Sequence, residues 1–410
     1  MLLNCIIRFY NICGDSASVL FYEDFYDVLR DFHVIDFGIF NKKSLLSNVY
    51  YAITDVCRHL NCATNTRYLY ITHFHTDHMS LIPALCSLYR RGGPRYYNYF
   101  NALIVPWPPY PQILRETIAM KLLVNQFFGI IIKYRRRDIL GELEKVIRGK
   151  VYFVKRGEKI PLYSNDYEVR VVWPPEEIEL NKNQIERLEN AYTQFKKILG
   201  QLMEIASEIE EIRRQEIIGE IRYMIQNPTV ILDYLSTREF EEMFSPTPAF
   251  ISLTELVTPD VKDLYTKFFD VSMRIKDILN ATSLAIKFII KSNKSKLFPG
   301  NKVTIATFLS DLENDVLDIL YEIVSEEIEW GINPFKTITL KAPHHGTSWG
   351  KYLRELIKHA FLVHIPWCPR KLRLGKINHR IIFTCEKYGT LINIPYYERL
   401  RPYTEISISV

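Results

Sequence analysis

In the first 175 residues the spacing of apolar positions alternates between that of strands and that of helices, which predicts alternating strands and helices. Short runs of β-branched and aromatic residues, bounded by turn residues, predict strands. The predicted strands are 6–9, 17–22, 33–36, 67–72, 102–105, 150–154 and 168–173. Pro174 and Pro175 end the last of them, because proline lacks the amide hydrogen that a sheet requires. We therefore expect residues 1–175 to form one α/β unit.

From residue 185 the apolar residues are separated by three or four positions, which is the spacing of one helix face. They are Ile185, Leu188, Tyr192, Phe195, Leu199, Leu202, Ala206 and Ile209, with Glu, Lys and Arg between them. The spacing predicts a long, coiled-coil-like helix within a helical insertion over residues 176–279. Such seams usually pack inside their own chain. We expect a helical hairpin, or a lid over a site, with the arm of a homodimer as the alternative.

The strand pattern resumes after the insertion. The predicted strands of this part are 284–290, 303–309 and 337–341, with 380–384 and 391–394 as closing strands. Their β-branched and apolar composition is typical of buried strands in an α/β fold. The expected organisation is therefore two halves of one fold, residues 1–175 and 280–410, interrupted by the helical insertion.

Composition narrows the class of protein. The chain has 410 residues, 48% of them hydrophobic, so it can bury a large core. Its net charge of +5 permits nucleic acid binding without requiring it. No apolar run approaches the length of a membrane span, and the first residues do not resemble a signal peptide. Seven cysteines without a C-x-x-C pair indicate reduced thiols, so we expect a cytoplasmic protein.

The strongest chemical pattern lies between residues 73 and 78. His73, His75, Asp77 and His78 place three imidazoles and one carboxylate in this short stretch. Imidazole and carboxylate groups are ligands for zinc and other first-row metals. The strand before the motif and the helical spacing after it place these side chains on a strand-to-helix turn. The pattern predicts a site for one or two divalent ions, and ordinary surface or core histidines are the alternative.

Five blocks in the chain resemble the metallo-β-lactamase fold superfamily, and within it the ComEC-type branch, the hydrolase domain of bacterial DNA-uptake channels. The blocks are residues 6–38, with a "GDS" turn and "IDFG", the motif at 73–78, "NATSL" at 280–284, "LSDLE" at 309–313 and "LKAPHHGT" at 340–347. The resemblance covers most of the chain except the helical insertion. It implies an α/β fold of the αββα sandwich type with a helical insertion.

The resemblance also implies a set of metal ligands. His73 and His75 would hold one ion, Asp77 and His78 the other, and Asp311 would bridge them. The ions implied are zinc or manganese, one or two in number.

Other residues would complete this centre. One histidine of the pair His344 and His345 would join the second ligand set, and the sequence leaves open which of the two it is. Asp36 and Asn280 would support the ligands from behind. Three features depart from the superfamily pattern: Ser310 replaces a glycine, residues 79–81 lack the glycine that usually follows the motif, and Asn280 stands where many members have a histidine. The ComEC-type branch itself has asparagine at this last position.

Metal-assisted hydrolysis is the chemistry that the resemblance implies. Asp77 would orient the attacking water. His379 would contact an oxyanion or a phosphate, and a surface histidine without a role is the alternative.

The predicted function is that of a soluble phosphodiesterase or nuclease. Basic residues, in one cluster beside aromatic ones, suit the phosphates and bases of nucleic acid. They are Arg90, Arg91, Arg95, Arg135, Arg136, Arg137, Arg370 and Lys371. One alternative is a hydrolase of a small molecule such as a cyclic nucleotide, ester or lactone. Another is a non-catalytic protein whose helical insertion recruits partners.

Overall fold

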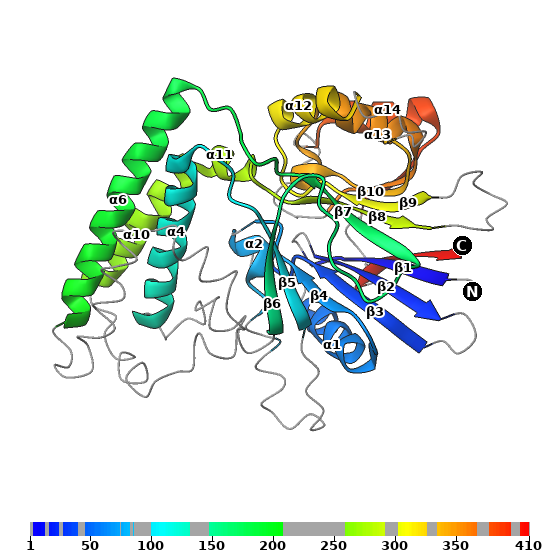
Figure 1. Cartoon of the computed structure of the whole chain (residues 1–410), viewed down its shortest axis with the longest axis horizontal. Helices are drawn as coiled ribbons and strands as arrows, with labels where there is room; N and C mark the ends of the chain where they lie inside the picture. The colour runs from blue at the N-terminus through cyan, green and yellow to red at the C-terminus, as the bar shows by residue number, and fades with distance from the viewer. Residues whose placement is uncertain are drawn as a thin grey trace.

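Two β-sheets face each other, and helices cover their outer faces (Figure 1). A further group of helices stands beside this sandwich. The computed structural model describes residues 3–12, 16–23, 28–39, 46–73, 75–82, 85, 100–131, 147–207, 259–291, 302–325, 334–366, 377–394 and 402–409. The layers are helix, sheet, sheet and helix, which confirms the αββα sandwich expected from the sequence.

The first sheet has the strand order β13-β1-β2-β3-β4-β5-β6. Its strands are β1 (Leu3–Tyr10), β2 (Ala17–Glu23), β3 (Val28–Ile35), β4 (Arg67–Tyr70), β5 (Phe100–Pro106), β6 (Ile147–Val154) and β13 (Tyr403–Ser409). The pairs from β13 to β3 are antiparallel, whereas β3, β4, β5 and β6 run parallel. The carboxyl ends of these parallel strands therefore share one edge of the sheet.

The second sheet has the order β12-β11-β10-β9-β8-β7. Its strands are β7 (Tyr167–Trp173), β8 (Ala285–Ile290), β9 (Val303–Phe308), β10 (Thr337–Lys341), β11 (Ala360–His364) and β12 (Leu391–Asn393). The strands from β9 to β12 are parallel, and β8 is antiparallel to both β7 and β9. Every strand predicted up to residue 341, and the one at 391–394, is present, whereas β11 and β13 were not predicted.

Among the described residues, the two sheets enclose one apolar core, and the helices on their outer faces enclose two more. Aromatic side chains between the sheets, including Phe21, Tyr70 and Phe288, are completely buried. Helix α1 (Leu46–Cys62) covers the first sheet. Helices α12 (Asn314–Ser325), α13 (Lys351–His359) and α14 (His379–Tyr388) cover the second. Strands buried on both faces have few polar positions, which is why their sequences are almost continuously apolar.

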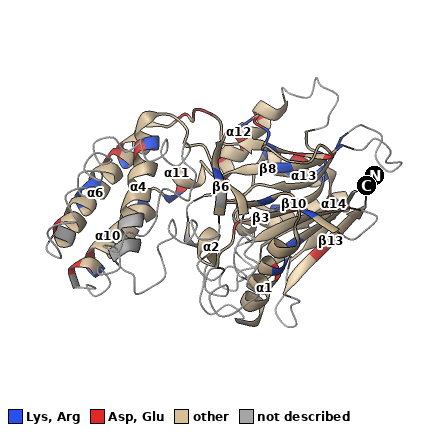
Figure 2. Ribbon diagram, turned by 60° about the horizontal axis from the view of Figure 1, so that its bottom comes forward, with Lys and Arg blue, Asp and Glu red and all other residues tan. Residues whose placement is uncertain are grey.

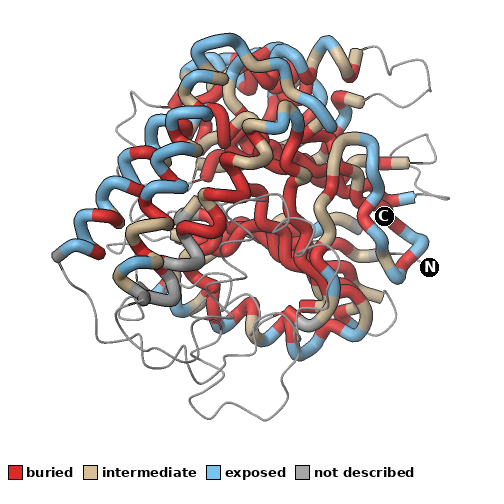
Figure 3. Tube along the Cα trace, turned by 60° about the vertical axis from the view of Figure 1, so that its left-hand side comes forward, coloured by how far each residue is buried: buried red, intermediate tan, exposed pale blue. Residues whose placement is uncertain are grey.

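The helical group consists of α4 (Gln112–Ile131), α6 (Lys182–Ser207) and α10 (Pro259–Arg274). The apolar seam of α6, including Leu188, Phe195 and Leu202, is buried against α4 and α10 of the same chain. The opposite faces of α6 and α10 are exposed to solvent (Figure 3). Intramolecular packing therefore accounts for the seam. No helix within the described ranges has the length and apolar character needed to cross a membrane.

The predicted strand at 380–384 is wrong, because these residues lie in helix α14. Asn378 accepts a hydrogen bond from the backbone N–H of Arg380 and so caps the start of the helix. Gly389 ends it in the left-handed conformation, at φ 69°. Ile381 and Cys385 are one helical turn apart and both buried. The β-branched pair at 381–382 suggested a strand, but the caps and this spacing favour a helix.

A buried histidine joins the two sheets. In the inter-sheet core, His33 Nδ1 lies 2.9 Å from the hydroxyl oxygen of Tyr70, and its Nε2 lies 2.7 Å from that of Tyr167. Burial lowers the pKa of His33 to about 3. In the unfolded chain the same imidazole titrates at about 6.5. Between these values the unfolded state binds more protons, so folding stability is lost as the pH falls below about 6.5.

This linkage predicts a steep acid dependence of stability. Each histidine with a lowered pKa contributes up to about 1.4 kcal/mol of lost unfolding free energy per pH unit. Urea titrations between pH 7 and pH 4 measure the slope. His33→Gln removes the titrating group while it keeps hydrogen-bonding atoms, so its slope should be smaller by about that amount. An unchanged slope in this variant would contradict the assignment.

Candidate metal centre

The candidate ligands lie on turns that follow strands at one edge of the sandwich. His73 follows β4, and His78 lies in the short helix α2 (Thr76–Met79). Asp311 follows β9 of the other sheet. Parallel strands place the loops after their carboxyl ends in a common crevice, where α/β proteins bind ligands. The topology thus brings together residues that are far apart in the sequence.

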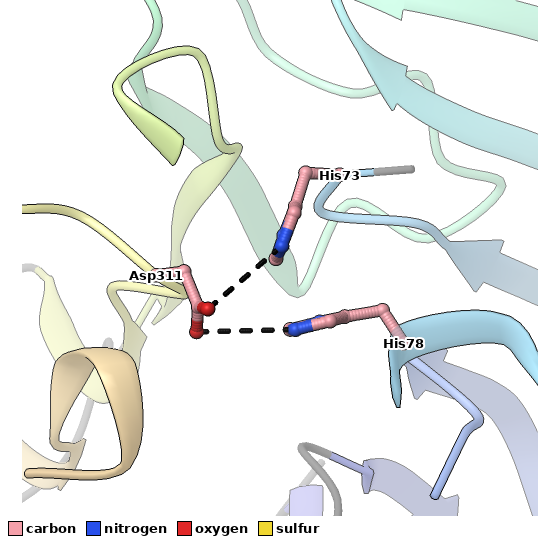
Figure 4. Close-up of side chains that lie close together, drawn as sticks. All are labelled: His73, His78 and Asp311. Atoms are coloured by element: carbon pink, nitrogen blue, oxygen red, sulfur yellow. Dashed lines mark ion pairs between the residues drawn. The ribbon is translucent and has the colours of Figure 1, made fainter. Parts of the chain in front are cut away.

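Three of these side chains form one group (Figure 4). The side chains of His73, His78 and Asp311 each offer one ligand atom, and these atoms lie within 4.8 Å of one another. Nε2 of His73 and Nε2 of His78 each lie 3.8 Å from an oxygen of Asp311. Donors about 2.1 Å from a tetrahedral ion are roughly 3.4 Å apart. The spacing is slightly wider than that of a tetrahedral site and is close enough for the group to hold an ion.

Asp36 lies behind His78 and orients it. His78 Nδ1 is 2.8 Å from Oδ2 of Asp36, and Thr72 donates its backbone N–H and its hydroxyl to the same carboxylate. All three residues are buried. A hydrogen bond from Nδ1–H to a carboxylate leaves Nε2 with its lone pair, which is the form that binds metals. The tautomer suited to a ligand is therefore the one that Asp36 favours.

Ser310 connects the two halves of the site. Its hydroxyl donates to the hydroxyl oxygen of Thr72 at 2.6 Å, and its carbonyl accepts from the backbone N–H of His344 at 2.8 Å. Its φ of 50° is in the left-handed region, where a glycine has no steric penalty. This conformation would suit the glycine that the resemblance implies at this position. Here the serine hydroxyl adds a hydrogen bond that glycine could not make.

Backbone strain is concentrated at this edge. Among the described residues, the non-glycine residues with positive φ are Asp36, Ser310, His344 and His345. Each such residue costs on the order of 1 kcal/mol, and such residues cluster at functional sites. Since all four flank the three-residue group, the strain marks the same place as the ligand geometry.

The imidazole of His73 is suited to bind a cation. Burial, the neighbouring His78 and His75, and then Lys121 and Lys276 hold the pKa of His73 well below its usual range. It is therefore neutral at physiological pH, as a metal ligand must be. Within the described ranges, its Nε2 is buried without a hydrogen-bond partner. An orphaned buried acceptor of this kind fits a site completed by an ion.

A second polar cluster lies beside the first and contains Glu313, which the sequence analysis did not single out. Its Oε1 lies 3.1 Å from Nδ1 of His344 and accepts a hydrogen bond from Asn280 at 2.9 Å. Partial burial raises the pKa of Glu313, but these two hydrogen bonds outweigh it, and the pKa is lowered. The only sequence signal was its place in the block at 309–313.

The other predicted site residues are placed differently. The ring of His75 lies 4.5 Å from that of His73, and the ring of His78 is closer, at 3.9 Å. His345 is buried but does not belong to the three-residue group. His379 is exposed on the first turn of α14. The backbone of Asp77 lies in α2, and its side chain lies outside what the structure describes.

The basic clusters predicted to contact nucleic acid also fall outside the described residues. They are Arg90, Arg91, Arg95, Arg135, Arg136, Arg137, Arg370 and Lys371. Their role stays a prediction.

This chain is similar in structure to a solved protein. The solved structure is the crystal structure of a long form RNase Z from yeast, with a TM-score of 0.33 and 8% sequence identity. The match covers 83% of this chain and 32% of the other, so this chain spans about a third of that protein. No family model and no curated protein matches the chain. The chemistry of the site therefore follows from this chain's own side chains.

The three-residue group predicts that divalent ions stabilise the fold. An ion that binds only the folded state at a hundred times its Kd adds about 2.7 kcal/mol of unfolding free energy. Zn²⁺ or Mn²⁺ should raise the thermal midpoint of the wild type, and Asp311→Asn should lose most of this increase. Scanning fluorimetry with elemental analysis measures both effects. Asp315→Asn, at an exposed position on α12, is the matched control. Equal increases in wild type and Asp311→Asn would exclude this centre.

The contact behind His78 predicts a graded loss. Asp36→Asn keeps the size of the side chain but removes the charge that orients His78, so metal affinity should fall about 10–100-fold. Calorimetric titration of the metal-free protein measures this. Asp166→Asn, which changes a half-exposed carboxylate, should leave affinity unchanged. The orienting role is wrong if Asp36→Asn folds normally and binds metal as tightly as the wild type.

Proposed function

We propose that this chain is a metal-dependent hydrolase of the metallo-β-lactamase superfamily that cleaves phosphodiester bonds in nucleic acid. The observation that carries the proposal is the convergence of His73, His78 and Asp311 from two sheets, with Asp36 behind His78. The block pattern favours the ComEC-type branch. The division into residues 1–175, 176–279 and 280–410 is part of the same proposal.

The residues of the group have distinct tasks in this proposal. A bound divalent ion would lower the pKa of a water molecule and polarise a phosphoryl oxygen. His73 and His78 present Nε2 atoms to such an ion, and Asp36 keeps the proton of His78 on Nδ1. The carboxylate of Asp311 faces both imidazoles and would neutralise part of the charge of an ion bound between them. All three ligand side chains are buried, so water reaches the centre from few directions.

The neighbouring cluster is proposed to extend the site. His344 is the better of the two adjacent histidines for a second ion or a phosphate oxygen. Its Nδ1 faces Glu313, which leaves Nε2 available for a ligand. Asn280 holds Glu313 in place through its amide nitrogen. His75 and Asp77 as further ligands, Asp77 as the residue that orients water, and His379 as a substrate contact complete the proposal.

A second candidate function is the hydrolysis of a small phosphodiester such as a cyclic nucleotide. A pocket beside His73 and His75 has a volume of about 430 Å³, including the part open to solvent. Its walls are mainly apolar, as those of small-molecule sites are. A nuclease that holds one nucleotide at a time would use the same space.

The proposal predicts ion-dependent cleavage. With Mn²⁺ or Zn²⁺, the wild type should cleave labelled single-stranded DNA or RNA. His73→Ala and Asp311→Asn should lower kcat/KM at least about 100-fold because each removes a metal ligand. Asp315→Asn on the exposed face of α12 should retain activity. Lack of cleavage of every nucleic acid and cyclic nucleotide tested, in protein shown to contain metal, would refute the proposal. Protein that binds no metal would favour a non-catalytic role.

A further inference from the structure

A pocket opens directly beside the metal centre, and the helical group forms much of its wall. His73 and His75 form one side, and the turn after β5, with Trp107, forms another. Helix α4 contributes Ile118, Lys121 and Leu122 to the lining. The end of α11 (Lys276–Asn280) closes it with Leu279. The sandwich therefore supplies the ligands, and the helices shape the space next to them.

The walls of this pocket are apolar and firmly held. Arg115 lies over the ring of Trp107 at 5.0 Å and Lys155 at 5.7 Å, measured to the ring centroid. Arg115 belongs to α4 and Lys155 follows β6, so cations from both the helical group and the sandwich hold the indole in place. Ile118 and Leu279 are buried in the core of the helical group. A preformed wall of this kind favours an organic group of defined size over bulk water.

Lys121 is the one lining residue that carries a full positive charge. Lys121 is partly buried, and among the described residues no carboxylate raises the pKa of its ammonium group. Burial and the positive charge of Lys276 lower the pKa of Lys121 to about 8, so it remains mainly protonated at neutral pH. The outer faces of the bundle are different, since Figure 2 shows positive and negative residues interspersed along α6.

The same two lysines extend positive potential to the metal centre. Both act on His73 and contribute to its lowered pKa. A partly buried cation next to an apolar wall and a candidate metal centre is complementary to an anionic group. An organic molecule with a phosphate group has both required parts, the apolar body and the negative charge.

We infer that this pocket binds one nucleotide unit of the substrate, with the phosphate that flanks the scissile bond held by Lys121. The inference rests on the proposed function, because it names the substrate unit next to the cleaved bond. Lys121 is then a specificity-determining residue that belongs to the helical group. The sandwich places the reacting bond, and α4 selects substrates with a second phosphate.

The test compares two substrates and two variants. A 5′-phosphorylated thymidine dinucleotide carries the flanking phosphate, and bis(p-nitrophenyl) phosphate does not. Lys121→Met, which keeps the length of the side chain without its charge, should raise KM for the dinucleotide about tenfold or more, the effect of losing one charge-assisted hydrogen bond. KM for bis(p-nitrophenyl) phosphate should rise much less than KM for the dinucleotide, and its kcat reports any effect of the lost charge on the metal centre itself. Lys121→Arg should have a KM for the dinucleotide close to that of the wild type. Lys197→Met, at an exposed position on α6, is the matched control.

A binding measurement separates this inference from the proposed hydrolysis. Calorimetry with thymidine 5′-monophosphate and metal-loaded protein needs no turnover. Binding to the wild type that Lys121→Met weakens supports the pocket even if nothing is cleaved, and only the proposed function then fails. Equal effects of Lys121→Met on both substrates, or no effect on either substrate or on nucleotide binding, would overturn the inference. Unchanged thermal midpoints and metal content show that the variant is folded.

Discussion

A short chain of hydrogen bonds joins the two sheets at the edge where the candidate site forms. Ser310 donates to Thr72, Thr72 donates to Asp36, and His78 contacts the same carboxylate. A buried carboxylate is costly to desolvate unless several donors satisfy it. Asp36 has three such donors, two of them from Thr72. All three donors lie on the segment after β4, and Ser310, on the turn after β9, links this segment to the second sheet. The position of His78 relative to Asp311 therefore depends on this network.

The same network accounts for the local strain. Asp36 and Ser310 both have positive φ, and both take part in these hydrogen bonds. A conformation that costs on the order of 1 kcal/mol persists when the surroundings determine it strongly. Here the bonds to Thr72 provide that determination. The strained backbone and the hydrogen bonds to Thr72 together fix the orientation of the Asp36 and Ser310 side chains, which the strands alone would not determine.

The helical group gives the chain a feature that the sandwich lacks. Its apolar seam is satisfied by α4 and α10, so the group is stabilised by its own packing. An ion pair between Arg187 and Asp277 also joins α6 to α11. Since α11 and α4 both line the pocket beside His73, this packing positions the wall of a site whose ligands belong to the sheets. In the proposed function, this arrangement would separate the chemistry of cleavage from the selection of substrate.

By itself the sequence determined what depends on local pattern: nearly all the strands, the long helix from residue 182, and a histidine-rich turn after a strand. The resemblance to a known family pointed to Asp311, which lies just after the strand predicted at 303–309. The local pattern misassigned α14, because a β-branched pair favours a strand locally and only the caps and the packing of Ile381 and Cys385 decide otherwise.

The grouping of the site was decided by the tertiary structure. Side chains on a tight turn point in directions set by individual φ and ψ angles, so spacing could not show that His73 would lie with His78 rather than His75 in the three-residue group. The contact of Glu313 with His344, and the place of Lys121 in the pocket wall, join distant segments. Such contacts depend on how separate elements pack, and no local pattern of residues encodes that packing.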